Sequence, residues 1–101
     1  MSIFAVRYSY GPGGAHRRAE LLQEHRAWLK TSNDEGRVLG AGIFPDTSGA
    51  LLVFEAESID AMHRDLAADP FAKAGAILET DVREWAPNWG VLARATTEAR
   101  R

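Results

Sequence analysis

The sequence predicts a single α+β domain in which two helices cover one face of a four-stranded antiparallel sheet. Its 101 residues fit one domain, and 46% hydrophobic content is enough for one core. Segments of alternating and helical periodicity follow the order β-α-β-β-α-β, which is the ferredoxin-like, or split βαβ, arrangement. We expect the domain to span residues 1–95 and the polar, basic end at 96–101 to fray.

The first half of the chain predicts a strand, a helix and a second strand. Residues 3–10 alternate between two faces, as a half-buried strand does. The GPGG segment at residues 11–14 breaks that pattern, and its role stays open. Leucines and a tryptophan then form one helical stripe within residues 15–35, and a strand over residues 37–44 follows.

The second half predicts a hairpin, a helix and a last strand. Residues 50–56 are nearly all apolar, as expected of a central strand covered on both faces. Ser58 is a good N-cap for the next helix, and Asp69 caps a further helical turn at residues 70–74. A final strand is predicted over residues 77–85.

Composition excludes several classes of protein. The net charge of −2 and scattered basic residues disfavour a nucleic-acid partner, and the pair Arg17-Arg18 is interpreted as solvated surface. The chain has no cysteine, so disulfides and thiolate chemistry are excluded. No apolar run approaches the length of a membrane span and no signal peptide is visible, which predicts a cytoplasmic protein without a membrane partner.

The predicted sheet has one face that the helices do not cover. In the split βαβ arrangement both helices pack on the same face. The other face still carries apolar side chains, which a small protein cannot leave open to water without a risk of aggregation. We therefore expect a homodimer that forms through this sheet face.

Four short motifs occur together: HRAWL at residues 25–29, DEGRVL at 34–39, AG at 41–42 and ADPF at 68–71. This combination resembles the YCII-related (YciI-like) family, and the similarity runs through most of the chain. The resemblance implies a dimeric α+β barrel, in which each subunit has a ferredoxin-like fold. It also implies a cleft with a His and Asp pair.

That pair maps to His25 and Asp69, the candidate catalytic residues. His25 lies in the apolar stripe of its helix, where an imidazole needs a hydrogen-bond partner. A carboxylate there fixes the tautomer and lets the ring act as general base or acid. The alternatives are a structural histidine and an aspartate that only caps its helix. The two roles of Asp69 are compatible if one oxygen accepts the capping amide and the other faces the imidazole.

Three more residues are candidates for substrate binding. Arg7 either clamps a substrate carboxylate or pairs with an acidic residue of the last strand, such as Asp81. Trp28 either lines the cleft or anchors the core, and Phe71 is the aromatic residue of the ADPF motif. No metal site is expected, because the histidines at 16, 25 and 63 lack the i, i+4 spacing of a helix-borne pair.

The resemblance implies a cofactor-free enzyme that transfers a proton on a small cyclic or aromatic compound, either an isomerase or a dehydrohalogenase-like lyase. A binding or accessory module without turnover, using the same dimer cleft, is the alternative. A monooxygenase of the same barrel superfamily is a third possibility, which rests on fold analogy alone.

Overall fold

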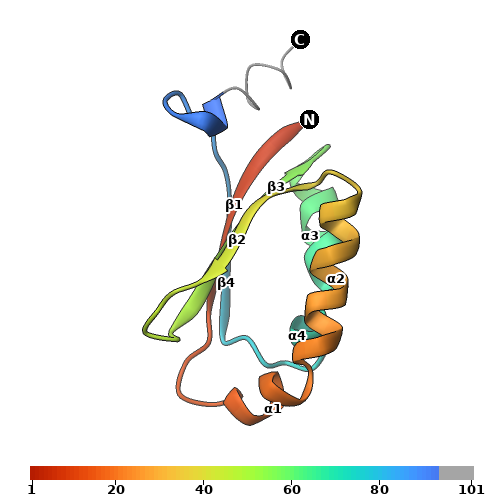
Figure 1. Ribbon diagram of the computed structural model, residues 1–101, viewed down its shortest axis with the longest axis vertical. Helices are drawn as coiled ribbons and strands as arrows, with labels where there is room; N and C mark the ends of the chain where they lie inside the picture. The colour runs from red at the N-terminus through yellow and green to blue at the C-terminus, as the bar shows by residue number, and fades with distance from the viewer. Residues whose placement is uncertain (94–101) are drawn as a thin grey trace.

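A computed structural model describes residues 1–93, and it has the predicted α+β architecture (Figure 1). One layer is a sheet, and the helices form a second layer on one side of it. Residues 94 and 95 of the expected domain, and the tail 96–101 that was expected to fray, lie outside the described residues.

Four strands form one antiparallel sheet in the order β2-β3-β1-β4. Their bounds are β1 Ser2–Ser9, β2 Val38–Ile43, β3 Gly49–Ala56 and β4 Glu79–Glu84. The two central strands, β1 and β3, are therefore neighbours although α1, α2 and β2 separate them in the sequence. This order is that of the ferredoxin-like fold, as predicted.

The helices are α1 Ala15–Glu20, α2 Leu22–Asp34, α3 Ile59–Ala67 and α4 Pro70–Lys73. The sequence predicted one helix over residues 15–35, but the backbone leaves helical values at Leu21 (φ −99°, ψ 6°). No glycine or proline marks this break, so helical spacing alone missed it. As a result α1 bends away from α2 and lies at the end of the space between sheet and helices (Figure 1).

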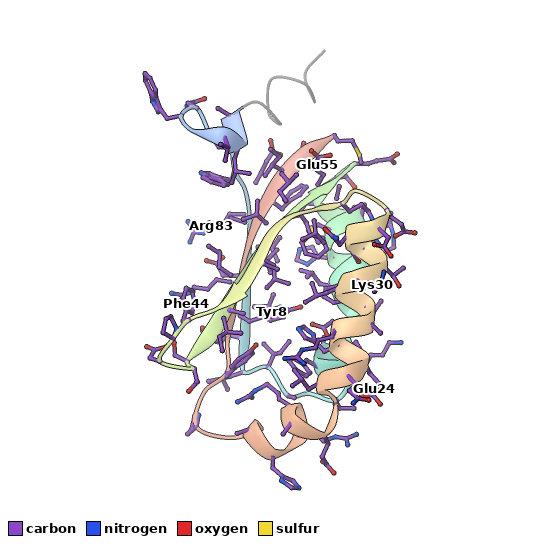
Figure 2. The ribbon with its side chains drawn as sticks, in the orientation of Figure 1. Tyr8, Glu24, Lys30, Phe44, Glu55 and Arg83 are labelled. Atoms are coloured by element: carbon purple, nitrogen blue, oxygen red, sulfur yellow. The ribbon has the colours of Figure 1, made fainter. Side chains whose placement is uncertain are left out.

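The core lies between the sheet and the helices because the strands alternate. Phe4, Val6 and Tyr8 of β1 point toward the helices and are buried, together with Phe54 of β3 and Met62 of α3. Figure 2 shows Tyr8 in this space and Arg83 on the opposite side of the sheet. The two faces of the sheet therefore have different surroundings.

The outer face of the sheet is only partly covered by residues 1–93. Leu51 keeps 43% of its surface exposed, whereas Val53 on the same face is buried. The prediction that residues 50–56 are covered on both faces therefore holds for Val53 and not for Leu51 within the described residues. Helices α1 to α4 lie on the other side of the sheet (Figure 1). Among residues 1–93, no helix has the length and apolar character needed to cross a bilayer.

Candidate functional site

The junction between α3 and α4 buries a carboxylate. Asp69 has an extended backbone that precedes Pro70, the first residue of α4, and its Oδ1 accepts the backbone N–H of Phe71 at 3.0 Å. The residue is 0% exposed. A carboxylate at such a position costs free energy unless hydrogen bonds replace its hydration. The capping bond is the first of three.

His25 of α2 supplies the second hydrogen bond. Its Nδ1 lies 2.8 Å from Oδ1 of Asp69, so the structure brings the two predicted catalytic residues into direct contact. Phe71 stacks on the imidazole, with ring centroids 4.0 Å apart and an angle of 2° between planes. The ring of Trp28 is also near the imidazole, with a distance of 5.9 Å between the two ring centroids. These contacts hold the imidazole in one orientation.

Tyr8 of β1 supplies the third bond, and the sequence reasoning missed it. Its hydroxyl donates to Oδ2 of Asp69 at 2.8 Å. Burial, followed by the negative charge of Asp69, raises the pKa of Tyr8 far above its ordinary value. A usable signal existed, since a tyrosine on the buried face of a strand needs a partner for its hydroxyl.

The distribution of bonds on Asp69 differs from the sequence-based expectation. One oxygen was expected to cap α4 and the other to face His25, but Oδ1 accepts both bonds. Oδ2 is occupied by Tyr8 instead. The carboxylate is thus satisfied from three elements, β1, α2 and the start of α4.

This hydrogen-bond network assigns the tautomer of His25. A carboxylate accepts hydrogen bonds, so Nδ1 of His25 must donate, and the neutral ring then carries its lone pair on Nε2. Among residues 1–93, no group makes a hydrogen bond to Nε2. His25 therefore has one nitrogen that is held and one that is free for a proton.

A cavity of about 420 Å³ adjoins the imidazole. This volume is within the range of about 300–1,000 Å³ that holds small-molecule ligands. Its lining includes Tyr10, Arg18, Leu22, His25, Ile43 and Phe71. A smaller hollow of about 90 Å³ shares Tyr10, His25 and Ile43 with it, so His25 lies where the two spaces meet.

A second hollow of similar size lies between α2 and β2. Its volume is about 430 Å³, and Arg26, Lys30, Asn33 and Gly40 belong to its lining. Neither His25 nor Asp69 lines it. Volume alone does not distinguish the two spaces, but the free imidazole nitrogen does, and we assign the candidate site to the cavity beside His25.

The sequence reasoning also missed Arg18 and Tyr10. The interpretation of Arg17-Arg18 as solvated surface fits Arg17, which is half exposed beside Glu20. Arg18 instead places its guanidinium 4.0 Å from the centre of the Tyr10 ring and lines the cavity. Burial raises the pKa of Tyr10, and the positive charge of Arg18 opposes this effect. The helical break at Leu21, which sequence did not reveal, positions α1 for this contact.

The structure separates the three predicted substrate-binding residues. Phe71 lines the cavity. Trp28 does not line it and packs on Phe54 at a centroid distance of 5.7 Å. Arg7 lies on the opposite face of the sheet, exposed and across from Asp81, because strand alternation points it away from its neighbour Tyr8.

Residues 1–93 contain no candidate metal-binding site. No group of three or more His, Cys, Asp or Glu side chains in this part of the chain could hold an ion. His16 and His63 are both exposed, and neither approaches the cavity lining. The site is built from an imidazole, a carboxylate, two phenols and a guanidinium.

Comparisons with known proteins identify the family and the fold. A family model for the YCII-related domain matches residues 3–86. A search of curated proteins finds no match. Among solved structures, 5-chloro-2-hydroxyhydroquinone dehydrochlorinase (TftG) from Burkholderia phenoliruptrix AC1100, in complex with 2,5-dihydroxybenzoquinone, is similar at 28% identity and a TM-score of 0.73. The similarity covers 82% of this chain and 92% of that one. The chain belongs to the YCII-related domain family.

Proposed function

We propose that this chain is an enzyme that moves protons on a small cyclic or aromatic compound, with His25 as general base and acid. One observation carries the proposal: the imidazole is held by buried Asp69 through Nδ1 while Nε2 is free beside a cavity of about 420 Å³. This is the arrangement in which a carboxylate fixes the tautomer of a catalytic histidine. The proposal assigns the chemistry to side chains and needs no bound cofactor.

The reaction class that we favour is elimination of hydrogen halide from a halogenated hydroquinone. Nε2 of His25 takes the proton of one ring hydroxyl and returns it to the ring carbon that bears the halogen. A second hydroxyl then gives its proton to Nε2, the carbon–halogen bond breaks, and the halide leaves with the electron pair. The net products are a quinone, one proton and one halide ion, so no external oxidant is required.

The structural neighbour supports this choice. That protein is a dehydrochlorinase for a chlorinated hydroxyhydroquinone, in complex with a dihydroxybenzoquinone. The cavity beside His25 has the volume to hold one substituted ring. Phe71, which stacks on His25, is an aromatic residue of its lining. If the substrate has no leaving group, the same acid–base cycle moves a proton between two ring positions, which is an isomerase.

The decisive experiment compares two histidine variants. Purified wild type, His25→Gln and His63→Gln are incubated with 5-chloro-2-hydroxyhydroquinone, and chloride release and quinone absorbance are recorded. We expect turnover by the wild type and a loss of about 100-fold or more in His25→Gln, since a positioned general base contributes about 10²–10⁴-fold. His63 is exposed on α3, so its variant is a matched control with unchanged turnover.

Each outcome of that experiment bears on the proposal. Full turnover by folded His25→Gln would remove His25 from the chemistry. A wild type that binds a panel of phenols, quinones and lactones, yet converts none of them, would make the chain a binding module and end the enzymatic proposal. Thermal shift identifies binding in that panel, because a ligand of the folded state raises the melting temperature.

We also propose that the chain forms a homodimer through the outer face of its sheet. This face carries a shallow groove that includes Gly42, Leu51 and Val53, and Leu51 is 43% exposed. Sedimentation equilibrium of the wild type should give the mass of a dimer, and Leu51→Glu should shift it toward a monomer, because a buried charge without a partner opposes association. A monomeric wild type at micromolar concentration contradicts this proposal.

A further inference from the structure

Arg18 is the cationic side chain that the cavity beside His25 presents to a ligand. Among residues 1–93, the rest of the lining is apolar, apart from Tyr10, Thr47 and His25 itself, and it contains no carboxylate. Asp69 lies behind the imidazole and is fully buried, so it does not face the cavity. Within this space the positive charge of Arg18 is not balanced by an acidic neighbour.

The hydrogen bonds of Arg18 leave part of its guanidinium unused. Nη1 donates to the backbone carbonyls of Ala76 at 2.7 Å and Gly13 at 3.2 Å. Those two bonds occupy both hydrogens of Nη1. No described residue accepts from Nη2 or Nε. Three N–H donors therefore remain for a ligand.

The loop after β1 holds the guanidinium in place. Gly14 has a φ of +83°, and a Cβ at this position would lie 2.9 Å from Nη1 of Arg18 and 3.3 Å from the carbonyl oxygen of Ala76. The ring of Tyr10 supports the opposite side, with Cζ of Arg18 4.0 Å from its centroid. The GPGG segment, whose role sequence left open, thus allows the close approach that fixes Arg18.

A purely structural role for Arg18 would be to tie α1 to the segment before β4. The bond to the carbonyl of Ala76 fulfils that role with Nη1 alone. It does not explain why Arg18, with three N–H donors unused, lines a ligand-sized cavity together with His25. A guanidinium fixed in this way is suited to pair with a planar oxyanion, which it binds through two parallel hydrogen bonds.

We propose that Arg18 is an anion-recognition residue and that the cavity selects small ring compounds that carry an oxyanion, either a carboxylate or an ionised ring hydroxyl. The inference rests on the proposed function only for the identity of the cavity. Arg18 pairs with the oxyanion at one side of the ring, which leaves the opposite side of the ring toward His25. Arg18 thereby positions the substrate and sets the charge that the site accepts.

The test is binding, measured by isothermal titration calorimetry, and needs no turnover. Three probes share one ring size: neutral hydroquinone, 2,5-dihydroxybenzoate with a carboxylate, and 2,5-dihydroxybenzoquinone with ionised ring hydroxyls. They are titrated into wild type, Arg18→Gln, Arg18→Lys and Arg17→Gln. The last variant is the matched control, because it removes the same charge one position away, from a side chain outside the cavity.

We expect the wild type to bind the two anions at least about 10-fold more tightly than hydroquinone. Arg18→Gln should weaken the anions by about 10- to 100-fold and hydroquinone by less than about 3-fold. Arg18→Lys should keep part of the preference because it keeps the charge but loses the planar fork. Arg17→Gln should match the wild type. The better of the two anions identifies the group that the substrate carries.

Three results would overturn this inference. They are equal affinity of the wild type for neutral and anionic probes, an equal loss of all probes in Arg18→Gln, and no binding of any probe to the wild type. If Arg18→Gln does not fold, the comparison of probes on the wild type still decides. Turnover by the wild type without anion preference would refute the role of Arg18 alone, while anion preference with full activity in His25→Gln would refute the proposed base alone.

Discussion

Two aspartates at the C-terminal end of α3 each form a junction with the segment of α2, and the two junctions differ. Asp69, which follows α3, contacts His25 of α2. Asp65, in the last turn of α3, accepts a hydrogen bond from Arg37, which follows α2. Arg37 also donates to Glu35 through Nε and Nη2 and to Ser32 through Nη2. The hydrogen bond to Glu35, and after it the negative charges of Asp65 and Glu35, raise the pKa of Arg37.

The difference lies in how many side-chain nitrogens of Arg37 and of His25 have a protein partner. All three nitrogens of Arg37 bond to protein groups, and the residue lines none of the cavities described above. His25 bonds through Nδ1 and leaves Nε2 free beside a cavity. A buried or half-buried charge pair is therefore no sign of a functional site by itself. A side chain that is fixed by hydrogen bonds, and that has an unbonded polar atom beside a cavity, is such a sign.

The largest predicted effect separates the two aspartates. Asp69→Asn should lower kcat by about 100-fold or more, because the neutral amide can still accept from Nδ1 of His25 but no longer supplies the negative charge that stabilises the protonated ring. Folding should persist, since asparagine also caps helices well. Asp65→Asn should leave kcat within about 2-fold. Steady-state kinetics of the two variants on one substrate make the comparison.

Equal kinetic losses in Asp69→Asn and Asp65→Asn would contradict the distinction between the two junctions. Circular dichroism and melting temperature serve as controls for folding. If Asp69→Asn unfolds, Asp69→Glu provides a second variant that keeps the charge but displaces it by one methylene. It should fold and still lose activity, since about 1 Å of misplacement is enough to impair catalysis.

Much of the fold followed from local patterns. Alternation in residues 3–10 and the apolar run at 50–56 predicted the central strands, and Ser58 and Asp69 were identified as helix caps that the structure confirms. The break at Leu21 was missed because neither glycine nor proline produces it.

The site was predictable only in part. The contact between His25 and Asp69 was expected from a family resemblance, because 44 residues separate the two and no periodicity connects them. Tyr8 and Arg18 were not assigned, since the fold brings the partner of each: Asp69 for one and Tyr10 for the other. Arg7 was expected either to clamp the substrate or to pair with an acidic residue of the last strand, and the structure places it on the other face, across from Asp81.

The second prediction tests the junction of Asp65 with Arg37, in which every side-chain nitrogen of Arg37 is hydrogen-bonded to protein. Arg37→Gln should lower the free energy of unfolding by about 1–3 kcal/mol, because Asp65, Glu35 and Ser32 lose charge-assisted hydrogen bonds from a partly buried donor. Turnover should stay within about 2-fold of the wild type. Urea unfolding and the kinetic assay check both statements, and a loss of activity without a loss of stability would assign Arg37 to the site.

The third prediction concerns Tyr8 and gives a smaller effect. Tyr8→Phe leaves Oδ2 of Asp69 without its donor and should cost about 1–2 kcal/mol of stability at pH 7. The wild type should also lose stability above about pH 10, the ordinary pKa of tyrosine. There the unfolded chain releases the phenol proton, whereas the raised pKa of Tyr8 keeps it bound in the folded state.

This alkaline loss gives Tyr8→Phe a signature of its own. For one retained proton the free energy of unfolding falls by about 1.4 kcal/mol per pH unit. Because the unfolded phenol is half ionised at pH 10, Tyr8→Phe should lose about 1 kcal/mol less than the wild type between pH 10 and pH 11, measured by urea unfolding. Equal slopes in the two proteins would mean that Tyr8 titrates as readily in the folded state as in the unfolded chain.

The smallest predicted effect links Tyr10 to Arg18. Burial raises the pKa of Tyr10 and Arg18 lowers it, so Arg18→Gln should raise this pKa further, while Arg17→Gln should not change it. Ultraviolet difference titration of each variant in the Tyr8→Phe background isolates Tyr10, the other tyrosine of the chain. A shift in Arg18→Gln alone would show that the guanidinium acts electrically on the cavity wall in solution, which an oxyanion in the same space would also experience. Equal curves for both variants would place the charge of Arg18 outside the cavity.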